Sequence, residues 1–347
     1  MGAVSEEADE PLRRSDPSRP GRAARRRARR RPPPLPQREG LDAVRWQVPR
    51  DASGARGALD SLRERFPALA DPAASPLGER FARGEVVDAD GAPWAAQDLV
   101  GPGDELWFHR ELRAEQVPAA ELSILHRDDH LLVLDKPHDM ATMPRGAHVL
   151  SSALVRLRRT TGIETLVPLH RLDRRTAGVL AFGIRPEERS AYQQLFARGE
   201  MDKEYEARVV PAADSALPRR VGEQALLRDR LVRTRGIATT QVVPGEPNAE
   251  TLLEVRALEA DGTLQLRLRP RTGRTHQLRA QLAARAAPIL GEDLYPPPPA
   301  RTATEPPASL PLQLLARSLA FTDPLTGDRR EFRSRRELAG ALRTLGP

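Results

Sequence analysis

One carboxylate stands among cationic side chains in residues 168–178, which read PLHRLDRRTAG. The carboxylate is Asp173, and the potential cations within three positions of it are His170, Arg171, Arg174 and Arg175. Positive neighbours favour the ionised form of a carboxylate, which can act as a nucleophile or position a substrate. The spacing alone fits a surface loop of salt bridges at least as well. Asp173 is therefore a candidate nucleophile that needs support from other parts of the chain.

A second polar cluster, RPRTGRTHQLR, occupies residues 269–279. Gly273 predicts a tight turn, and Thr275 is placed to cap a helix that follows it. Backbone N–H groups at a helix start, together with neighbouring arginines, form a site for an anion. That anion could be an RNA phosphate or the Asp173 carboxylate. The alternative interpretation is an ordinary basic turn between a strand and a helix.

Tyr205 ends the short segment MDKEY at residues 201–205 and is one of three tyrosines. Its ring can stack on a base and its hydroxyl can exchange a proton, although a half-buried structural tyrosine is the alternative. Lys203 lies two residues before it, and Lys136 is the one other lysine among 55 basic residues. A lysine retained in so arginine-rich a chain indicates a need for a compact ammonium group. Chance in so small a sample is the alternative.

Strands and hairpins with interspersed helices would position these residues. Residues 250–258 and 263–268 alternate between apolar and polar around an Asp-Gly turn, which predicts a hairpin. The other expected elements are hairpin strands at 123–126 and 131–134, strands at 203–210 and 312–321, helices at 187–198, 275–285 and 335–345, and a proline-rich loop at 296–311. This succession favours an α+β domain with a largely antiparallel sheet.

Composition divides the chain into three parts. Residues 1–40 are expected to form a disordered Arg/Pro-rich tail, because ten arginines and a single acid lie between residues 13 and 31. Such a tail would attract nucleic acid through phosphate contacts, and an inert solvated extension is the alternative. The pattern of residues 41–118 predicts a small region with short helices at 58–66 and 76–83, a strand and turn at 85–91 and a strand near 106–108. Residues 119–347 carry the polar clusters and form the expected catalytic domain.

Several classes of protein are excluded by what the chain lacks. It has no cysteine, which excludes disulfides, cysteine-bound zinc and thiol nucleophiles. No apolar run approaches the roughly 20 residues that a membrane span needs. No apolar segment follows the charged N-terminus, as a secretory signal would require. We therefore expect a cytoplasmic protein, and the spacing of its histidines predicts no metal site.

Five short elements together resemble the signatures of the RluA-type family of RNA pseudouridine synthases. Residues 170–178, HRLDRRTAG, resemble the family's His-Arg-Leu-Asp, two variable residues, Thr-Ser-Gly. Residues 271–279, RTGRTHQLR, resemble its second signature. The remaining three elements are LDKP at 134–137, KEY at 203–205 and LAFTDPLTG at 319–327. They occur in the family's order and place the resemblance over about residues 123–330.

The resemblance implies the pseudouridine-synthase fold, which is a largely antiparallel mixed sheet with flanking helices and a central catalytic cleft. It implies a monomer that isomerises specific uridines in structured RNA, with ribosomal RNA as the first candidate and transfer RNA as the second, and that needs no cofactor or metal. Asp173 would be the nucleophile, Tyr205 would lie against the target base and Arg274 would pair with the aspartate. Arg171 would help to hold the flipped-out nucleotide or would fill its place. Lys203 and Lys136 would support the cleft and, like Arg279, contact RNA. His170 and His276 would be structural or would contact RNA.

Two features depart from the family's pattern. Ala177 replaces the usual serine, which removes one hydroxyl but none of the site residues named above. Residues 41–118 only faintly resemble the small ribosomal-protein-like RNA-binding module of many relatives, so we expect a diverged module there. An inactive RNA-binding or ribosome-assembly protein on the same fold is the alternative function, although the key residues are intact. A hydrolase would need a second acid that the sequence does not identify.

Overall fold

The computed structural model describes residues 32–339 except 52–53, 55, 71–74, 113–114, 119–120, 147 and 296–309. The described chain forms two compact units. The smaller unit holds Asp42–Glu111, and the larger holds Gln37–Leu41 together with the chain from Leu112 onward. Most of the expected tail, residues 1–31, lies outside the described residues.

The smaller unit packs short helices against two pairs of strands. Its elements are β1 (Val44–Gln47), β2 (Arg56–Gly57), α2 (Ala58–Arg65), η1 (Pro67–Ala70), α3 (Leu77–Ala82), β3 (Leu99–Val100) and β4 (Glu105–Phe108). Strand β1 pairs with β4, and β2 pairs with β3. The two predicted helices are present, but the strand expected at 85–91 is not. Val87 there forms isolated bridges with Trp107 and Pro93, because Asp88 accepts hydrogen bonds from two backbone N–H groups and turns the chain.

The larger unit is built on one mixed sheet, which has eleven strands within the described part of the chain. Its strands are β5 (Ile124–Arg127), β6 (Leu131–Lys136), β7 (Val167–Pro168), β8 (Ala177–Gly183), β9 (Asp202–Val209), β10 (Gln224–Val232), β11 (Gln241–Val243), β12 (Ala249–Leu258), β13 (Leu264–Pro270), β14 (Leu314–Thr322) and β15 (Arg329–Arg333). Their order is β11-β10-β12-β13-β9-β14-β8-β6-β5, with β15 beside β14 and β7 beside β8. All pairs are antiparallel except β14 with β8. The α+β class and the largely antiparallel sheet are confirmed.

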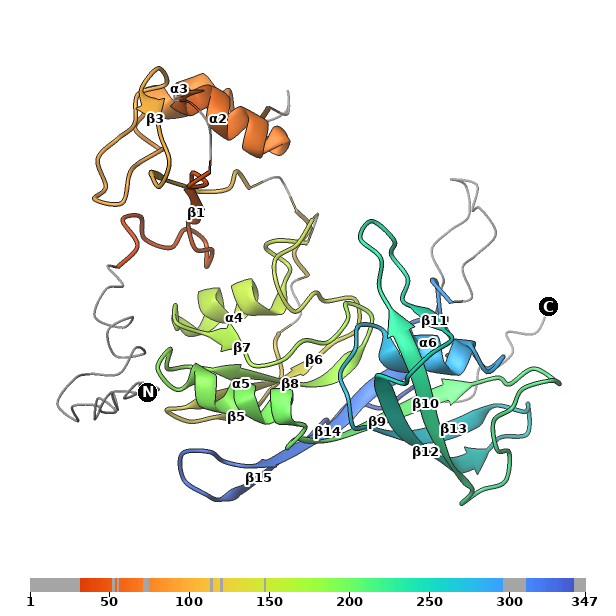
Figure 1. Ribbon diagram of the computed structural model, residues 1–347. Coiled ribbons are helices and arrows are strands. Elements are labelled where there is room, and N and C mark those ends of the chain that lie inside the picture. The colour runs from red at the N-terminus through yellow and green to blue at the C-terminus, as the bar shows by residue number, and fades with distance from the viewer. Residues whose placement is uncertain are drawn as a thin grey trace, which may run out of the picture. The chain divides into compact units, whose positions relative to one another are not determined.

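In the described part of the larger unit, three helices cover this sheet: α4 (Ala153–Thr161), α5 (Arg189–Arg198) and α6 (Gln277–Ala283) (Figure 1). Every residue of β6 is buried, because α4 packs on one face of the β6–β8 half and α5 packs on the other. Strands β12 and β13 alternate between buried and exposed residues, because α6 covers one of their faces. The hydrophobic pattern thus reports directly how many faces of each strand are covered.

The prediction of a closing helix at 335–345 is wrong for the described part of that range, because residues 334–339 are not helical. Buried Asp135 binds the start of this segment. Its carboxylate accepts hydrogen bonds from the Ser334 hydroxyl at 2.7 Å and the Arg335 backbone N–H at 2.8 Å. A carboxylate that contacts successive residues in this way competes with helical backbone pairing. Residues 340–347 lie outside the described part of the chain.

Gly178 makes the parallel contact between β8 and β14 possible. Its φ is +111°, and a Cβ atom there would lie 2.2 Å from the carbonyl oxygen of Ala316. We expect Gly178→Ala to lower the free energy of unfolding by at least about 3 kcal/mol, because the backbone of β14 must move. Urea unfolding measures the loss. Gly262→Ala is the matched control, because Gly262 has φ +85° with no atom within 4 Å and should lose only about 1 kcal/mol.

Candidate active site

A pocket of about 640 Å³ in the larger unit gathers most of the predicted site residues. The loop between β7 and β8 contributes Asp173, β9 contributes Tyr205, and the loop from β13 into α6 contributes Arg274. The other predicted residues that line it are His170, Arg171, Lys203, His276 and Arg279. Three segments far apart in sequence therefore meet around one carboxylate and one phenol. The volume is in the range of small-ligand sites and is large enough for one nucleotide.

The Asp173 carboxylate is largely buried, with 20% of its side chain exposed. Its own carbonyl accepts a hydrogen bond from the Thr176 N–H at 3.1 Å, which closes the loop as a turn. The preceding residue, Leu172, is held at both backbone atoms by Thr142. The Thr142 hydroxyl donates to the Leu172 carbonyl at 2.8 Å and accepts from its N–H at 3.1 Å. Thr142, which carries no motif that would have predicted this role, thus fixes the position of the candidate nucleophile.

Tyr205 lies on β9, and its half-buried side chain packs against two apolar clusters. Burial raises the pKa of its hydroxyl well above the ordinary value, and the negative charge of Asp173 raises it further. The phenol is therefore protonated at neutral pH. A ring held at the wall of the pocket with a neutral hydroxyl can stack on a base and donate a hydrogen bond.

Arg274 does not pair with Asp173 as expected. Its side chain is exposed, and its Nε donates to the Asn248 carbonyl at 3.1 Å. Among the described residues, the ion-pair contact of Asp173 within 4 Å is with His276, whose Nε2 lies 3.8 Å from Oδ1. The ionisable side chain within 4 Å of the aspartate is therefore a histidine of the second signature, and the charge of Asp173 also acts on buried Lys136 and Arg279.

The turn before α6 also differs from the prediction. His276, rather than Gly273, adopts the left-handed conformation, with φ +53°, and it precedes α6 in place of Thr275. A non-glycine residue in this region is strained and is held by its surroundings. Here His276 Nδ1 lies 3.0 Å from the Tyr295 hydroxyl. Burial lowers the pKa of His276, and the charge of Asp173 opposes that effect.

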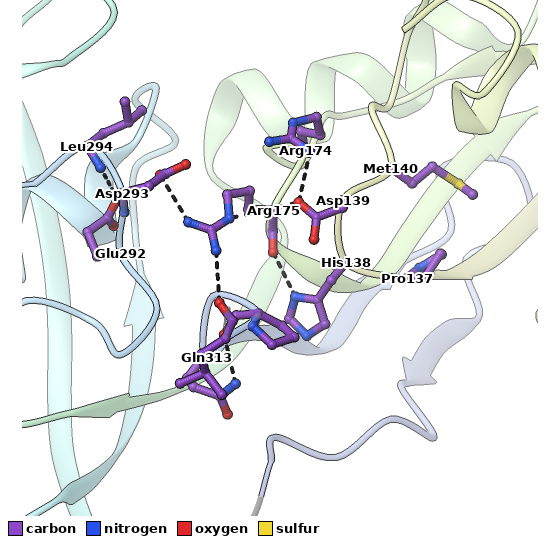
Figure 2. A network of polar contacts seen from close by, with 12 residues as sticks. Pro137, His138, Asp139, Met140, Arg174, Arg175, Glu292, Asp293, Leu294 and Gln313 are labelled. Atoms are coloured by element: carbon purple, nitrogen blue, oxygen red, sulfur yellow. Dashed lines mark hydrogen bonds and ion pairs between the residues drawn. The ribbon is translucent and has the colours of Figure 1, made fainter. Parts of the chain in front are cut away.

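Arg279 is buried rather than free to meet RNA. Its guanidinium binds Glu292 and lies 3.0 Å from an oxygen of Asp293. The same Asp293 oxygen lies 3.1 Å from Nη1 of Arg175, in the catalytic loop. Asp293 therefore bridges the two signature segments, and Figure 2 shows its contact with Arg175. Sequence analysis missed Asp293 and treated Arg175 only as a neighbour of Asp173.

Lys136 is the clearest correction among the predicted RNA-binding residues. It is fully buried and is not among the residues that line the pocket. Its ammonium donates to the carbonyls of Pro137 at 2.9 Å, Met140 at 2.9 Å and Arg174 at 3.1 Å. Burial lowers the pKa of Lys136 to about 7, while the charge of Asp173 opposes that effect. Lys136 thus supports the catalytic loop from behind instead of contacting RNA.

Replacing Lys136 by methionine is expected to destabilise the larger unit. The change leaves three buried carbonyl oxygens without a donor, so we expect a loss of about 2–5 kcal/mol in the free energy of unfolding. Urea unfolding followed by circular dichroism measures it. Lys203→Met is the control within the same chain, because Lys203 donates only to the Thr272 carbonyl, at 3.0 Å. Equal losses for the two variants would contradict the special role of Lys136.

Of the remaining predicted residues, His170 and Lys203 support the site, and Arg171 is available to bind RNA. His170 Nε2 accepts the Ala181 N–H at 3.1 Å, and its ring stacks on Phe196 with centroids 4.8 Å apart. Burial lowers the pKa of His170 to about 3, so the ring is neutral. Lys203 ties β9 to the second signature loop, and burial lowers its pKa. Arg171 is exposed at the pocket wall, where it is available to a phosphate.

Two kinds of feature are absent from the described residues. Groups of three or more His, Asp or Glu side chains arranged to hold a metal ion are not found there. No helix in the described ranges is long and apolar enough to cross a membrane.

Comparisons with known proteins agree on one family. The family model described as RNA pseudouridylate synthase matches residues 130–284. A dual-specificity RNA pseudouridine synthase RluA from Pasteurella multocida is 32% identical over 211 residues, which cover 59% of this chain and 89% of the relative. The enzyme of the same description from Escherichia coli K12 is also 32% identical, over 61% of this chain and 92% of its own. The structure of human RNA pseudouridylate synthase domain containing 1 has 20% identity and a TM-score of 0.48, covering 66% of this chain and 94% of its own.

Proposed function

Because this chain belongs to the RluA-type family of RNA pseudouridine synthases, we propose that its pocket isomerises uridines in structured RNA with Asp173 as the nucleophile. The observation that supports this assignment most directly is the position of Asp173. Its carboxylate and the Tyr205 ring line the same nucleotide-sized pocket, and the charge of Asp173 acts on the Tyr205 hydroxyl. The carboxylate and the aromatic ring are thus near enough to act on one nucleotide.

The reaction needs a charged nucleophile and a confined base. The bond between uracil N1 and the anomeric carbon of the ribose breaks, the base turns, and a ring carbon forms the new bond to the same ribose carbon. The proton of this ring carbon leaves, and N1 takes up a proton. We propose that Asp173 attacks the anomeric carbon and displaces uracil, and that the turned base then displaces Asp173; the second route is its assistance in removing the neighbouring 2′ proton. His276, 3.8 Å from the carboxylate, would orient it in either route. Tyr205 would hold the detached uracil by stacking, so that the base turns without leaving.

The experiment that tests this function uses the full chain and RNA transcripts. Purified protein is incubated with ribosomal and transfer RNA, and pseudouridine is measured by mass spectrometry of nuclease digests. We expect pseudouridine at one or a few defined uridines. Tight RNA binding without any pseudouridine in either class would instead favour the inactive RNA-binding protein.

We propose ribosomal RNA as the first target class, transfer RNA as the second, and the cytoplasm as the place of action. The related enzymes are described as having dual specificity, so both RNA classes belong in the test. We further propose that the smaller unit assists RNA binding as a diverged module. It carries a pocket of about 450 Å³ of its own, where half-buried Trp46 and exposed Arg65 offer a stacking ring and a cation.

Deleting residues 1–31 is expected to weaken RNA binding by about 10-fold or more at low salt, because phosphate contacts of the arginines are lost. The slope of log Kd against log salt should fall as well. The deletion stops at Arg31 so that Gln37–Leu41, which belong to the larger unit, stay in place. In this segment Gln37 donates to the Glu164 carbonyl, and the Gly40 carbonyl accepts from Arg158.

A full-length variant with the ten arginines changed to glutamine separates charge from length. It should behave like the deletion in a filter-binding titration. Identical binding by the native chain and both variants at low salt would show that the tail is inert.

A further inference from the structure

We propose that a second pocket, on the other side of Asp173, binds the nucleotide that adjoins the target uridine in the RNA chain. The proposal rests on the proposed function of the first pocket. The second pocket has a volume of about 450 Å³ and shares a wall with the first. The residues that line both pockets are Arg171, Leu172, Asp173, His276 and Arg279. Asp173 therefore lies at the boundary between two nucleotide-sized spaces.

The far wall of the second pocket offers apolar surface to a flat ligand. It is formed by the segment that follows β6, including Met143 and Pro144, and by Leu294. Met143 is 50% exposed, although methionine is more often buried. A thioether packs favourably against aromatic rings and adapts to their shape. An exposed methionine beside a pocket of this size suits the face of a nucleobase.

Two cations of this pocket remain available for phosphate. Arg174 is already paired with Asp139 at 2.9 Å, and Arg175 with Asp293 at 3.1 Å. Arg145 and Arg171, in contrast, are exposed, and neither makes an ion pair with any side chain of the described residues. A guanidinium group without a carboxylate partner binds phosphate oxygens through its forked donors. The surplus positive charge of this pocket thus lies on the two side chains that solvent can reach.

The position of Arg171 explains why the ligand would be the adjoining nucleotide. It lines both pockets, so a phosphate bound by Arg171 can join a nucleotide in one pocket to a nucleotide in the other. The second pocket is also held in shape without RNA. Thr142 bonds Leu172 through both backbone atoms, and Arg145 and His148 exchange two backbone hydrogen bonds of 3.0 Å. A preformed site lowers the ordering entropy lost on binding and can offset the unstacking of the target base.

Met143→Ala and Arg145→Ala test the proposal by RNA binding. Each is made in a chain that also carries Asp173→Asn, so that affinity is measured without turnover. The RNA contains the target uridine, either with both neighbouring bases or with an abasic residue on one side of it. On intact RNA we expect Met143→Ala to raise Kd about 2- to 10-fold through lost packing on the base. Arg145→Ala should raise Kd about 5-fold and reduce its salt dependence.

The abasic RNAs identify the contact. The abasic residue on the correct side should weaken binding by the parent chain, and Met143→Ala should then add little, because both changes remove one interaction. Leu325→Ala and Arg127→Ala are matched controls, since Leu325 is exposed by 42% and Arg127 is exposed at the end of β5. The proposal is overturned if Met143→Ala and Arg145→Ala bind RNA like these controls. It is also overturned if the losses of affinity caused by Met143→Ala and by the abasic residue are additive whichever side of the target uridine carries the abasic residue. Failure of the proposed function would appear separately, as absence of pseudouridine with the native chain.

Discussion

Replacing Asp173 by asparagine is expected to reduce pseudouridine formation by roughly 10⁴-fold or more, because the nucleophile is lost. Asparagine keeps the size of the side chain and most of its hydrogen-bonding capacity, so the fold and the RNA affinity should stay near native values. Single-turnover assays with excess enzyme, followed by mass spectrometry of the product RNA, measure the rate.

The same substitution elsewhere provides the control. Asp129→Asn changes a carboxylate that is 85% exposed and contacts Arg185 at 3.5 Å, so it should leave the rate unchanged. Measurable multiple turnover by pure Asp173→Asn enzyme would contradict the assignment of Asp173 as the nucleophile. Deamidation of the asparagine must be excluded by intact mass in that experiment.

Replacing Tyr205 by phenylalanine should separate its two possible roles. Phenylalanine keeps the ring, so the stacking contribution of about 1–3 kcal/mol to RNA binding should remain. It lacks the hydroxyl, so any proton transfer or hydrogen bond in the transition state is lost. We expect turnover to fall on the order of 100-fold or more at nearly native Kd.

Tyr205→Leu removes both functions and should weaken RNA binding as well as turnover. Native turnover by Tyr205→Phe together with an inactive Tyr205→Leu would show that the residue only stacks. That outcome would mean that another group removes the proton lost in the reaction, in agreement with a Tyr205 hydroxyl that burial and Asp173 keep protonated. Full activity of Tyr205→Leu would remove Tyr205 from the site altogether.

The surroundings of Asp173 differ from what the sequence around it predicts. Four potential cations lie within three positions of the aspartate in the chain. In the structure His170 is neutral, Arg174 binds Asp139, and Arg175 binds Asp293 (Figure 2). These partners lie 35 and 118 residues away, so no local pattern could identify them. The available cation from that cluster is Arg171, which is one of the five residues that line both proposed nucleotide sites.

Local sequence predicted several of the elements in which burial is periodic, although not β10 or α4. The β12–β13 hairpin follows from strict alternation, because a strand with one covered face must place apolar side chains at every second position. The retained lysines also carried information. Lys136 directs three donors to three carbonyls, which a compact ammonium group does and a planar guanidinium does not. The five signatures predicted the family, which the comparisons confirm.

Only the tertiary structure decided which of the predicted residues face the pocket and which support it. Sequence spacing could not show that Lys136 is buried, that His276 rather than Arg274 lies within 4 Å of Asp173, or that Asp135 binds residues 334 and 335. The contacts of Asp173 and Asp135 join segments that are about 100 or more residues apart. The three carbonyls around Lys136 lie closer to it in the sequence. Hydrogen bonds and ion pairs of this kind depend on distances of a few ångströms. Those distances are set by strand order and helix packing, which local composition does not encode.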